Sequence, residues 1–326
     1  VVDGIPVMLL DEVEQTLWVG TASLARSRTA EGADATAEPV PYADTLGISP
    51  VEFEQLLNLS PNGAVDPVVQ MSVARTCGNL YVPLVGKLDR YPIPELRLPA
   101  SQGERFLEVG CNWGRWCVAA ARKGYLVVGL DPSLGAVLAA RRVCQQLGVS
   151  ARFVVGDGRY LPFAPGVFDI TFAYAVFHSF SKENARMALK EMERVLRSGG
   201  RALVQLPNFF GLRCFYNNAR RGFREATEFE VRFWRLSEMR KVFANLFGNV
   251  RFSVDGYFGL GVQETDIALL PPSFRMIVRS SSILRRLSLK LPFMKMFADS
   301  IFVHSERTPR PGNRPFSASQ SNGKNR

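Results

Sequence analysis

From Arg105 onward, short apolar runs alternate with longer amphipathic segments, and this pattern constrains the fold more than any other feature. Such alternation is typical of βαβ units, whose strands run parallel. We therefore predict an α/β domain with a doubly wound, mostly parallel seven-stranded sheet. Strands are expected at Arg105–Val109, Tyr125–Leu130, Ala151–Val155, Phe168–Tyr174 and Arg201–Leu206, helices at Trp113–Arg122, Leu134–Leu147, Lys182–Leu196 and Ser237–Phe247, and the last strands near Val250–Val254 and Ser300–His304.

The residues outside this pattern divide the rest of the chain. A helical extension is expected over 46–100, because Ser49-Pro50 and Asp66-Pro67 are typical helix starts. The stretch 21–45 has little apolar periodicity and is interpreted as a linker, and the polar tail 307–326 is expected to be disordered. The main domain then spans 101–306, with insertions covering the substrate at 207–235 and 257–298.

Acidic residues follow the first three predicted strands in a regular way. The first strand leads into a glycine loop, Gly110 to Gly114, with Glu108 just before it. The second ends at Asp131, which can accept hydrogen bonds from ribose hydroxyls or, alternatively, cap the next helix. The third is followed by Asp157, which can accept from an adenine amino group. In a doubly wound sheet these positions share one edge, where ligands bind.

The same residues distinguish between two nucleotide cofactors. A dinucleotide fingerprint has a third glycine where this chain has Arg115, and a carboxylate at Glu108 opposes a pyrophosphate. A nucleoside that carries a cation fits better. An oxidoreductase that uses NAD is therefore the less favoured alternative.

Five motifs in order resemble the class I S-adenosylmethionine-dependent methyltransferases, including their small-molecule branch called type 11. They read EVGCNWG, GLDPS, GDGRYLPF, FDI and RVLRSGG, within about 105–206. The resemblance implies S-adenosyl-L-methionine as cofactor, with the Gly110 loop on the methionine, Asp131 on the ribose, and Asp157 with Gly158 on the adenine. Asn112 departs from the family, which more often has glycine there. The cofactor residues expected are Glu108, Gly110, Cys111, Asn112, Gly114, Asp131, Pro132, Ser133, Asp157, Gly158 and Tyr174.

Methyl transfer from a sulfonium depends mainly on alignment, so a catalytic dyad is not required. His178, just past the fourth strand, is the candidate general base, because an imidazole accepts protons near neutral pH. Tyr174 is the second catalytic candidate, through its hydroxyl or by packing on the cofactor. A pocket-lining role without catalysis is the alternative for His178.

The acceptor side is expected in an aromatic and basic segment after the fifth strand. Asn208, Phe209, Arg213, Arg220 and Arg221 are the candidate contacts for an acceptor with an apolar body and acidic groups. Further on, residues 271–298 alternate apolar and basic side chains, a pattern typical of helices on anionic membrane surfaces. Packing of that helix on its own domain is the alternative. The expected acceptor is a small, lipid-linked or glycan-linked molecule.

Charge and cysteine content limit the remaining function classes. The net charge is +10, but residues 271–326 hold eleven Lys/Arg and two Asp/Glu, so the other 270 residues are nearly neutral. A nucleic-acid partner is therefore not favoured. Five scattered cysteines and two distant histidines predict no metal site, and reduced thiols in a cytoplasmic protein. No apolar run is long enough to span a bilayer.

A second resemblance concerns the first residues. The sequence from Asp3 to Glu12 is similar to the tail of Trm112-like zinc-binding domains, which carry cysteine pairs upstream. We interpret residues 1–20 as a remnant of such a module, or as a strand packed on the catalytic domain. This motivates tRNA or protein methylation as an alternative function. A non-catalytic nucleoside-binding module of the same fold is another.

Overall fold

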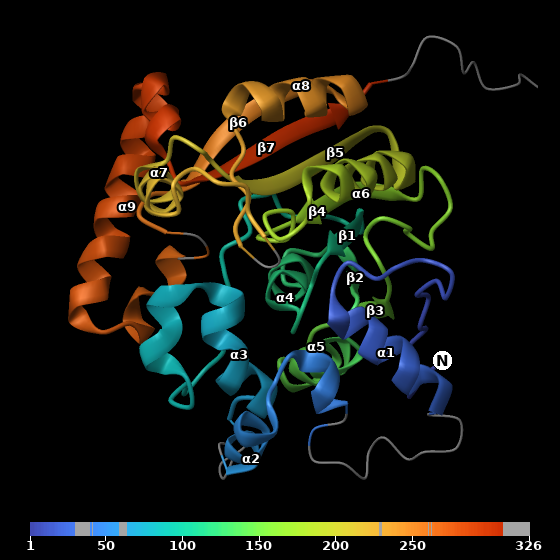
Figure 1. Ribbon diagram of the computed structural model, residues 1–326. Helices are drawn as coiled ribbons and strands as arrows, with labels where there is room; N and C mark the ends of the chain where they lie inside the picture. Colours follow the sequence, from blue (N-terminus) through green and yellow to red (C-terminus); the bar gives the residue numbers. More distant parts are fainter. Residues whose placement is uncertain are drawn as a thin grey trace, which may run out of the picture.

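A seven-stranded sheet forms the centre of the part of the chain that the computed structural model describes, which is residues 1–29, 40, 42–58, 64–227, 230–259, 261 and 263–308. Its strand order is β3-β2-β1-β4-β5-β7-β6 (Figure 1). The α/β fold predicted from the sequence is confirmed. The strands are β1 (Arg105–Val109), β2 (Leu126–Asp131), β3 (Ala151–Val155), β4 (Phe168–Ala173), β5 (Leu196–Pro207), β6 (Gly248–Gly256) and β7 (Ser300–Arg307).

Strands β1 to β5 are parallel, and β7 is antiparallel to both β5 and β6. Strand β1 pairs with β2 on one side and with β4 on the other. The order of the sheet therefore reverses between β1 and β4. In doubly wound sheets the crevice at this point, beyond the carboxyl ends of the strands, is where ligands bind.

Helices cover both faces of the sheet, and the alternation of side chains along β1 shows how. Phe106 packs with the helices α4 (Arg115–Ala121) and α5 (Leu134–Gln146). Leu107 and Val109 pack on the opposite face, with α6 (Lys182–Val195) and α8 (Leu236–Leu246). Side chains of a strand point alternately to its two faces, so Glu108 shares the α4 side with Phe106.

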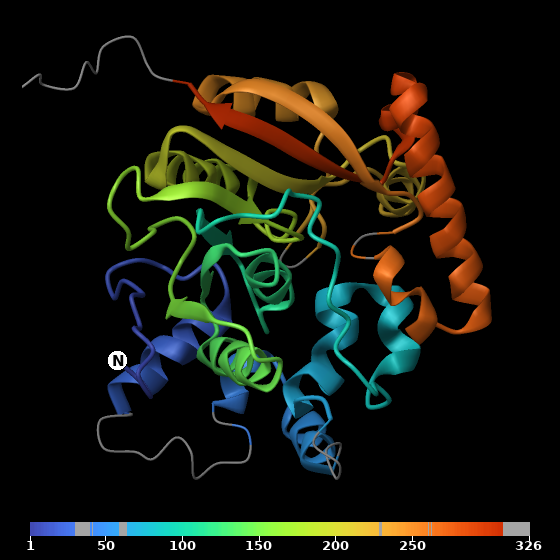
Figure 2. The same ribbon diagram turned by 180° about the vertical axis from the view of Figure 1, so that it is seen from behind.

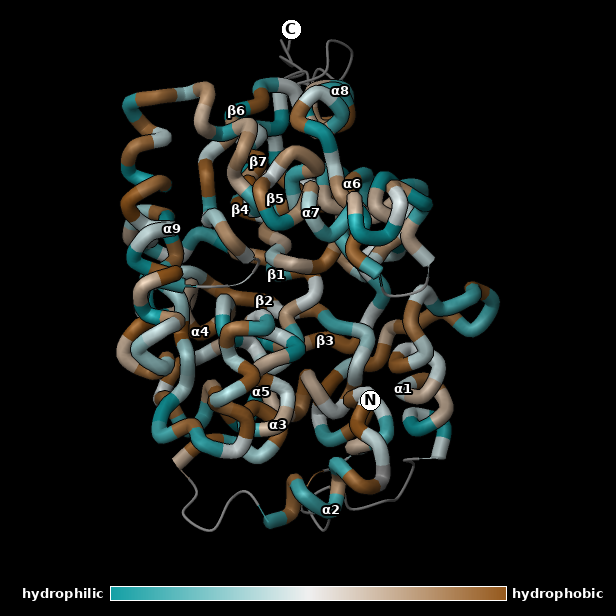
Figure 3. The backbone as a smooth tube through the Cα atoms, turned by 60° about the vertical axis from the view of Figure 1, so that its left-hand side comes forward, coloured by the Kyte–Doolittle hydropathy of each residue, from teal (hydrophilic) through white to brown (hydrophobic). Residues whose placement is uncertain are grey.

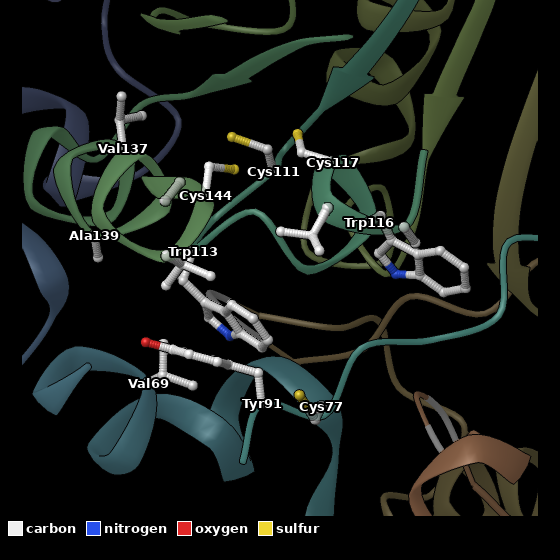
Figure 4. Packing of buried hydrophobic residues seen from close by; sticks show 14 of the residues in the cluster. Val69, Cys77, Tyr91, Cys111, Trp113, Trp116, Cys117, Val137, Ala139 and Cys144 are labelled. Atoms are coloured by element: carbon white, nitrogen blue, oxygen red, sulfur yellow. The ribbon is translucent and has the colours of Figure 1, made fainter. Parts of the chain in front are cut away.

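The predicted helical extension is present and shares a core with the main domain. It contains α2 (Pro50–Asn58), α3 (Pro67–Cys77) and the 3-10 helix η2 (Asn79–Leu84). The Asp66 side chain caps α3 by accepting from Val68 N–H at 2.9 Å. Figure 4 shows Trp113, from the loop after β1, facing Tyr91, and their ring centroids are 6.1 Å apart. The connector after η2 then runs behind the sheet to β1 (Figure 2).

The first 29 residues follow the prediction only in part. Residues 6–8 pack on the main domain, one of the two predicted alternatives, by pairing with the edge strand β3: Val155 N–H donates to Pro6 O at 2.9 Å and Met8 N–H to Val155 O at 2.7 Å. The linker predicted for 21–45 is wrong over the helix α1 (Trp18–Thr29) and the 3-10 helix η1 (Ala43–Leu46), and its residues 30–39 and 41 lie outside the described residues. Helix α1 buries only two small residues, Gly20 and Ser23. The sequence therefore has no apolar period there that would have predicted a helix.

Two insertions lie beside the carboxyl ends of the strands. Helix α7 (Leu212–Arg220) follows β5, while η3 (Glu264–Leu269), α9 (Pro272–Lys290) and η4 (Pro292–Phe297) stand between β6 and β7. Figure 1 shows α9 along one side of the molecule, next to α7. No helix among the described residues is long and apolar enough to cross a membrane. The predicted tail begins inside β7, and residues 309–326 lie outside the described part.

Candidate cofactor and acceptor site

A cavity of about 790 Å³ opens at the carboxyl edge of the sheet, where its strand order reverses. The residues at the tips of β1 to β4 form its floor, as the sequence predicted for a ligand site. This volume is typical of pockets for cofactors and small molecules. The floor residues are Val109, Gly110, Asn112, Leu130, Asp131, Pro132, Ser133, Asp157, Gly158, Tyr174, Ala175 and Val176.

The glycine loop after β1 uses all five of its backbone amides internally. The N–H groups of Gly110 and Cys111 donate to Leu130 O at 2.7 and 3.0 Å, and that of Gly114 donates to Cys111 O at 2.8 Å. Those of Asn112 and Trp113 donate to the Asp131 and Asn112 side chains at 2.9 and 2.8 Å. The amide donors that the sequence interpretation expected to be available are therefore occupied. A loop of this kind offers carbonyl oxygens, which suit a protonated amine and not a phosphate.

Left-handed backbone conformations explain the residue types of this loop. Gly110 has φ +77°, and a Cβ there would lie 2.3 Å from the Val176 side chain. Asn112, where the resembling family more often has glycine, has φ +45°. Asparagine tolerates this region better than most residues. Its own side chain also accepts from the Trp113 amide, which stabilises the turn.

Asp131 links the tips of β1 and β2. Its Oδ2 accepts from Asn112 N–H at 2.9 Å, and its Oδ1 accepts from Ser133 N–H at 3.0 Å. Burial raises the pKa of its carboxyl to about 6, although both amides act in the opposite direction. Asp131 lines the cavity, so it caps the following helix and also has acceptor capacity for a ligand, the two roles left open by the sequence.

Asp157 lines the cavity but is paired with Arg159, a residue that the sequence interpretation missed. Arg159 donates to Asp157 Oδ2 from Nη2 at 2.7 Å and from Nε at 3.0 Å. Its backbone N–H donates to Oδ1 at 2.8 Å. The same guanidinium donates to Glu14 O at 2.5 Å and so attaches the N-terminal segment to this end of the site.

Three of the expected cofactor residues do not line the cavity. Glu108 lies under the loop, where Cys117 Sγ donates to its carboxyl at 2.9 Å. Burial raises its pKa to about 8, so at neutral pH it is mostly protonated and is not the anion expected beside a cationic ligand. Cys111 is buried, and its pKa is raised to about 11. Gly114 packs closely on Ala140 of α5.

The two catalytic candidates, His178 and Tyr174, both line the cavity. Within the described residues His178 Nδ1 has no hydrogen-bond partner. Burial lowers its pKa to about 4, and Arg232 acts in the same direction, so the imidazole is neutral at physiological pH but a weaker base than the ordinary histidine that the sequence interpretation assumed. The Tyr174 hydroxyl donates to Asp255 at 2.7 Å and accepts from Gln263 at 3.0 Å. Burial and Asp255 raise its pKa well above the ordinary value, so it is a poor proton donor or acceptor for an acceptor molecule.

On the acceptor side, the inner face of α7 lines the cavity through Arg213, Cys214, Asn217 and Arg221. The other three candidates lie elsewhere. Asn208 is fully buried and its Nδ2 donates to Met296 O at 2.7 Å. Phe209 packs on Phe210, and Arg220 lies over the Tyr216 ring. The sequence interpretation did not separate the two faces of α7, which helical spacing distinguishes.

One wall of the cavity comes from the N-terminal hundred residues, which the sequence interpretation did not assign to the site. These residues reach the cavity through contacts between segments that are distant in the sequence, and no local sequence motif predicts such contacts. The shared core around Trp113 places α3 there, and the Arg159 contact with Glu14 places the first segment. The residues involved are Thr16, Leu17, Val19, Thr45, Leu46, Ser72, Ala74, Arg75, Thr76, Cys77, Gly78, Asn79 and Leu80.

Arg115, at the start of α4, is a buried cation with incomplete pairing. Its Nη2 lies 3.2 Å from Asp266 Oδ2, which also accepts from the Tyr81 hydroxyl. Its Nε and Nη1 have no hydrogen-bond partner among the described residues. This cluster joins α4, the N-terminal extension and η3. The pairing with Asp266 gives a structural reason for an arginine directly after the loop, where a dinucleotide fingerprint would have glycine.

Comparison with known proteins agrees with this geometry. Residues 106–200 match a family model described as a methyltransferase domain, and they include the loop and the three strand tips of the site. Over these residues the chain is similar to a methyltransferase domain, as the sequence motifs predicted. S-adenosyl-L-methionine is the cofactor that the sequence motifs imply for such a domain. The comparison does not bear on the resemblance of residues 3–12 to Trm112-like domains.

Relatives of the methyltransferase domain carry different names. A demethylmenaquinone methyltransferase of Beutenbergia cavernae is 40% identical over 110 residues, 33% of this chain and 42% of that protein. A tRNA (carboxymethyluridine(34)-5-O)-methyltransferase of Schizosaccharomyces pombe is 32% identical over 120 residues, which are 36% of this chain and 46% of that protein. An uncharacterised methyltransferase of Synechocystis is 33% identical over 124 residues, which are 37% of this chain and 57% of that protein. The chain thus spans about half the length of these relatives. A solved SAM-dependent methyltransferase of Methanosarcina mazei has a TM-score of 0.45 at 18% identity, covering 64% of this chain and 94% of that one.

Proposed function

We propose that this chain transfers a methyl group from S-adenosyl-L-methionine to an amphipathic small or lipid-linked acceptor. One observation carries the proposal: the cavity at the switch point is bordered by Asp131, Asp157 and a loop whose amides are all used. Carboxylates and carbonyl oxygens accept hydrogen bonds from hydroxyls and amines and repel a pyrophosphate. The site therefore favours an adenosine with a cationic group.

The residues present fit this cofactor. Asp131 would hold the ribose, Asp157 and Gly158 the adenine, and the loop beginning at Gly110 the methionine amino group. The cofactor supplies a methyl group on a sulfonium, which leaves without further activation. The protein then aligns the acceptor, and alignment of this kind can correspond to an effective molarity of about 10⁵ M or more.

His178 is the residue that we propose takes a proton from the acceptor. Its Nδ1 is buried and has no partner among the described residues, and its imidazole is neutral above about pH 4. Arg213 and Arg221, on the cavity side of α7, would orient an acidic or strongly polar group of the acceptor. The apolar part of the acceptor would lie along Phe180, Val231 and Phe233, which also line the cavity.

Methylation of tRNA or protein is the second candidate, and the Schizosaccharomyces pombe relative gives a reason to test it. Against it stands the cavity itself, whose inner wall includes Leu80, Phe180, Cys214 and Phe233. An apolar wall of this kind suits an acceptor with a hydrocarbon or ring body. The demethylmenaquinone methyltransferase of Beutenbergia cavernae is named for an acceptor of that type.

Two measurements test the proposal. Calorimetric titration with S-adenosylhomocysteine should show binding to the full chain. Incubation with cofactor labelled in its methyl group should then move label from the cofactor into the organic phase of a total lipid and metabolite extract. Label appearing instead in bulk tRNA or protein would favour the second candidate. Absence of binding in the calorimeter would contradict both and leave a non-catalytic module.

A further inference from the structure

Helix α7 has two different faces, and the outer one is exposed, with Phe215 packing on Phe209 and Phe223. Its inner face lines the cavity. Its outer face follows helical spacing with apolar side chains at 212, 215, 216, 219 and 223, a stripe that a globular domain normally buries. The exposed fractions are 48% for Leu212, 43% for Phe215, 59% for Tyr216 and 53% for Phe223.

A second exposed apolar stretch lies on the C-terminal part of α9 and on η4, which follows it. Leu287, Leu289 and Leu291 are 42%, 73% and 45% exposed, and Phe293 and Phe297 are 60% and 47% exposed. Figure 3 shows brown and teal residues alternating along the outside of α9. The buried positions of that helix are Val278, Ser281, Ser282 and Ser288. Phe274, Ile277 and Leu284 pack partly on the core, whereas Met276, Ile283, Leu287 and Leu289 are exposed.

Hydrogen bonds join the two stretches into one surface, which we call the lid surface: residues 210–223 together with 279–297. Asn208 donates to Met296 O at 2.7 Å, just before α7 begins. Asp299, just after η4, accepts from the Arg213 and Cys214 amides at 2.7 and 2.8 Å and so caps α7. The start of α7, whose inner face lines the cavity, is therefore held against the end of η4.

The charged side chains of these two stretches are all basic. Residues 208–224 hold four arginines and residues 271–298 hold six Arg or Lys, and neither stretch contains an Asp or Glu. Since the chain has 40 basic and 30 acidic residues, these ten account for its whole excess of positive charge. Some are paired, as Arg285 and Arg286 are with Glu264. Arg279 and Lys290 are exposed on the outer side of α9 and make no ion pair with described residues.

We propose that the lid surface binds an anionic lipid bilayer. Aromatic and aliphatic side chains interleaved with cations, without carboxylates, complement acyl chains below negatively charged headgroups. A second copy of the chain is a poorer partner, because a two-fold interface would place the same cations against one another. Nucleic acid would match the cations but not the exposed leucines.

If the proposed function holds, this orientation also explains how an acceptor reaches the site. A lipid-linked acceptor would leave the bilayer beneath α7 and meet Arg213 and Arg221 on its inner face. Docking itself does not depend on methyl transfer, so the two can fail separately.

The test is co-sedimentation of the full chain with vesicles of phosphatidylcholine, alone or with about one third phosphatidylglycerol. Binding is expected only with the anionic vesicles, and it should weaken as salt is raised. Phe215→Ser with Phe293→Ser should weaken it at least about tenfold by removing inserted rings, and Arg279→Glu with Lys290→Glu should do the same by reversing charge. Matched controls are Leu57→Ser on α2 and Lys241→Glu on α8, which should bind as the unaltered chain does.

Calorimetric binding of S-adenosylhomocysteine, measured for each variant, reports on folding and on the proposed function independently of docking. The proposal is overturned if the unaltered chain does not sediment with anionic vesicles, or if both pairs of substitutions leave vesicle binding unchanged. It is also overturned if sedimentation velocity shows a dimer that Phe215→Ser with Phe293→Ser dissociates, or if bulk tRNA binds more tightly than anionic vesicles and competes them off.

Discussion

The carboxylate of Asp131, at the tip of β2, accepts a 2.9 Å hydrogen bond from the backbone N–H of Asn112, in the turn after β1. The tips of β1 and β2 are therefore connected before any ligand arrives. Ser133 N–H occupies the other carboxylate oxygen at 3.0 Å. Each oxygen of a carboxylate has two lone pairs, so both retain capacity for a hydroxyl donor from the cavity.

Asp131→Ala is expected to weaken S-adenosylhomocysteine binding about tenfold to a hundredfold. The change removes the ribose acceptor and leaves the Asn112 amide without a partner, at a cost of about 1–3 kcal/mol. Calorimetry measures the affinity, and urea unfolding measures the loss of stability. Asp169→Ala is the matched control, because that carboxylate lies at the opposite end of the sheet and accepts from Arg105 N–H at 2.8 Å. Equal affinities for the two variants would contradict the assignment of Asp131.

Arg159→Ala is expected to loosen the first segment of the chain and to weaken cofactor binding about tenfold. The guanidinium joins Asp157 Oδ2 at 2.7 Å to Glu14 O at 2.5 Å, so its loss frees residues 14–19 beside the site. Amide hydrogen exchange of that segment and calorimetry measure the two effects. Arg141→Ala is the control: Arg141 pairs with Asp3 in the same segment but away from Asp157. Faster exchange without a change in affinity in both variants would exclude a role of the segment in binding.

Glu108→Gln is expected to change how stability depends on pH. The pKa of Glu108 in the folded chain is about 8, above the ordinary 4.5, because its carboxyl is buried. Between those values the folded chain binds more protons than the unfolded chain, so the free energy of unfolding falls as pH rises through this window. The amide removes this term and should flatten the slope by up to about 1.4 kcal/mol per pH unit.

Urea unfolding at several pH values between 5 and 8 measures that slope. Glu183→Gln, on the exposed side of α6, is the matched control. Parallel slopes for Glu108→Gln and the unaltered chain would mean that Glu108 is ionised in the folded state.

Much of the sheet could be predicted from the sequence, because its signals are local. The β1 and β3 boundaries agree residue for residue, since each strand is a short, mostly apolar segment that is followed by glycine. Glu108 was misplaced for a reason that strand geometry could have corrected. Its neighbours Leu107 and Val109 face α6, so alternation along β1 directs Glu108 toward Cys117 and the opposite face.

The rest of the site could not be predicted, because it depends on contacts between distant segments. Arg159 pairs with Asp157 two residues away, but its second contact, Glu14, is far along the chain. Helix α1 has no apolar stripe, and it is held instead by polar contacts such as that of Leu134 N–H with Ser23 Oγ at 2.9 Å. Helical spacing separates an apolar face of α7 from a polar one, but it does not show that the polar face lines the cavity and the apolar face is exposed.

His178→Gln is expected to lower kcat about a hundredfold or more, if the acceptor must lose a proton. The pKa of His178 is about 4, below the ordinary 6.5, because the ring is buried and Arg232 lies nearby. The imidazole therefore stays neutral as pH falls from 8 to 6, and the rate of the unaltered enzyme should show no inflection near 6.5 from this group. The pH dependence of kcat, measured with labelled cofactor for both proteins, checks both statements. Tyr174→Phe is the comparison, and its effect on kcat should be smaller because that hydroxyl already donates to Asp255 at 2.7 Å. A larger fall in kcat for Tyr174→Phe than for His178→Gln would move the proton-transfer role to Tyr174.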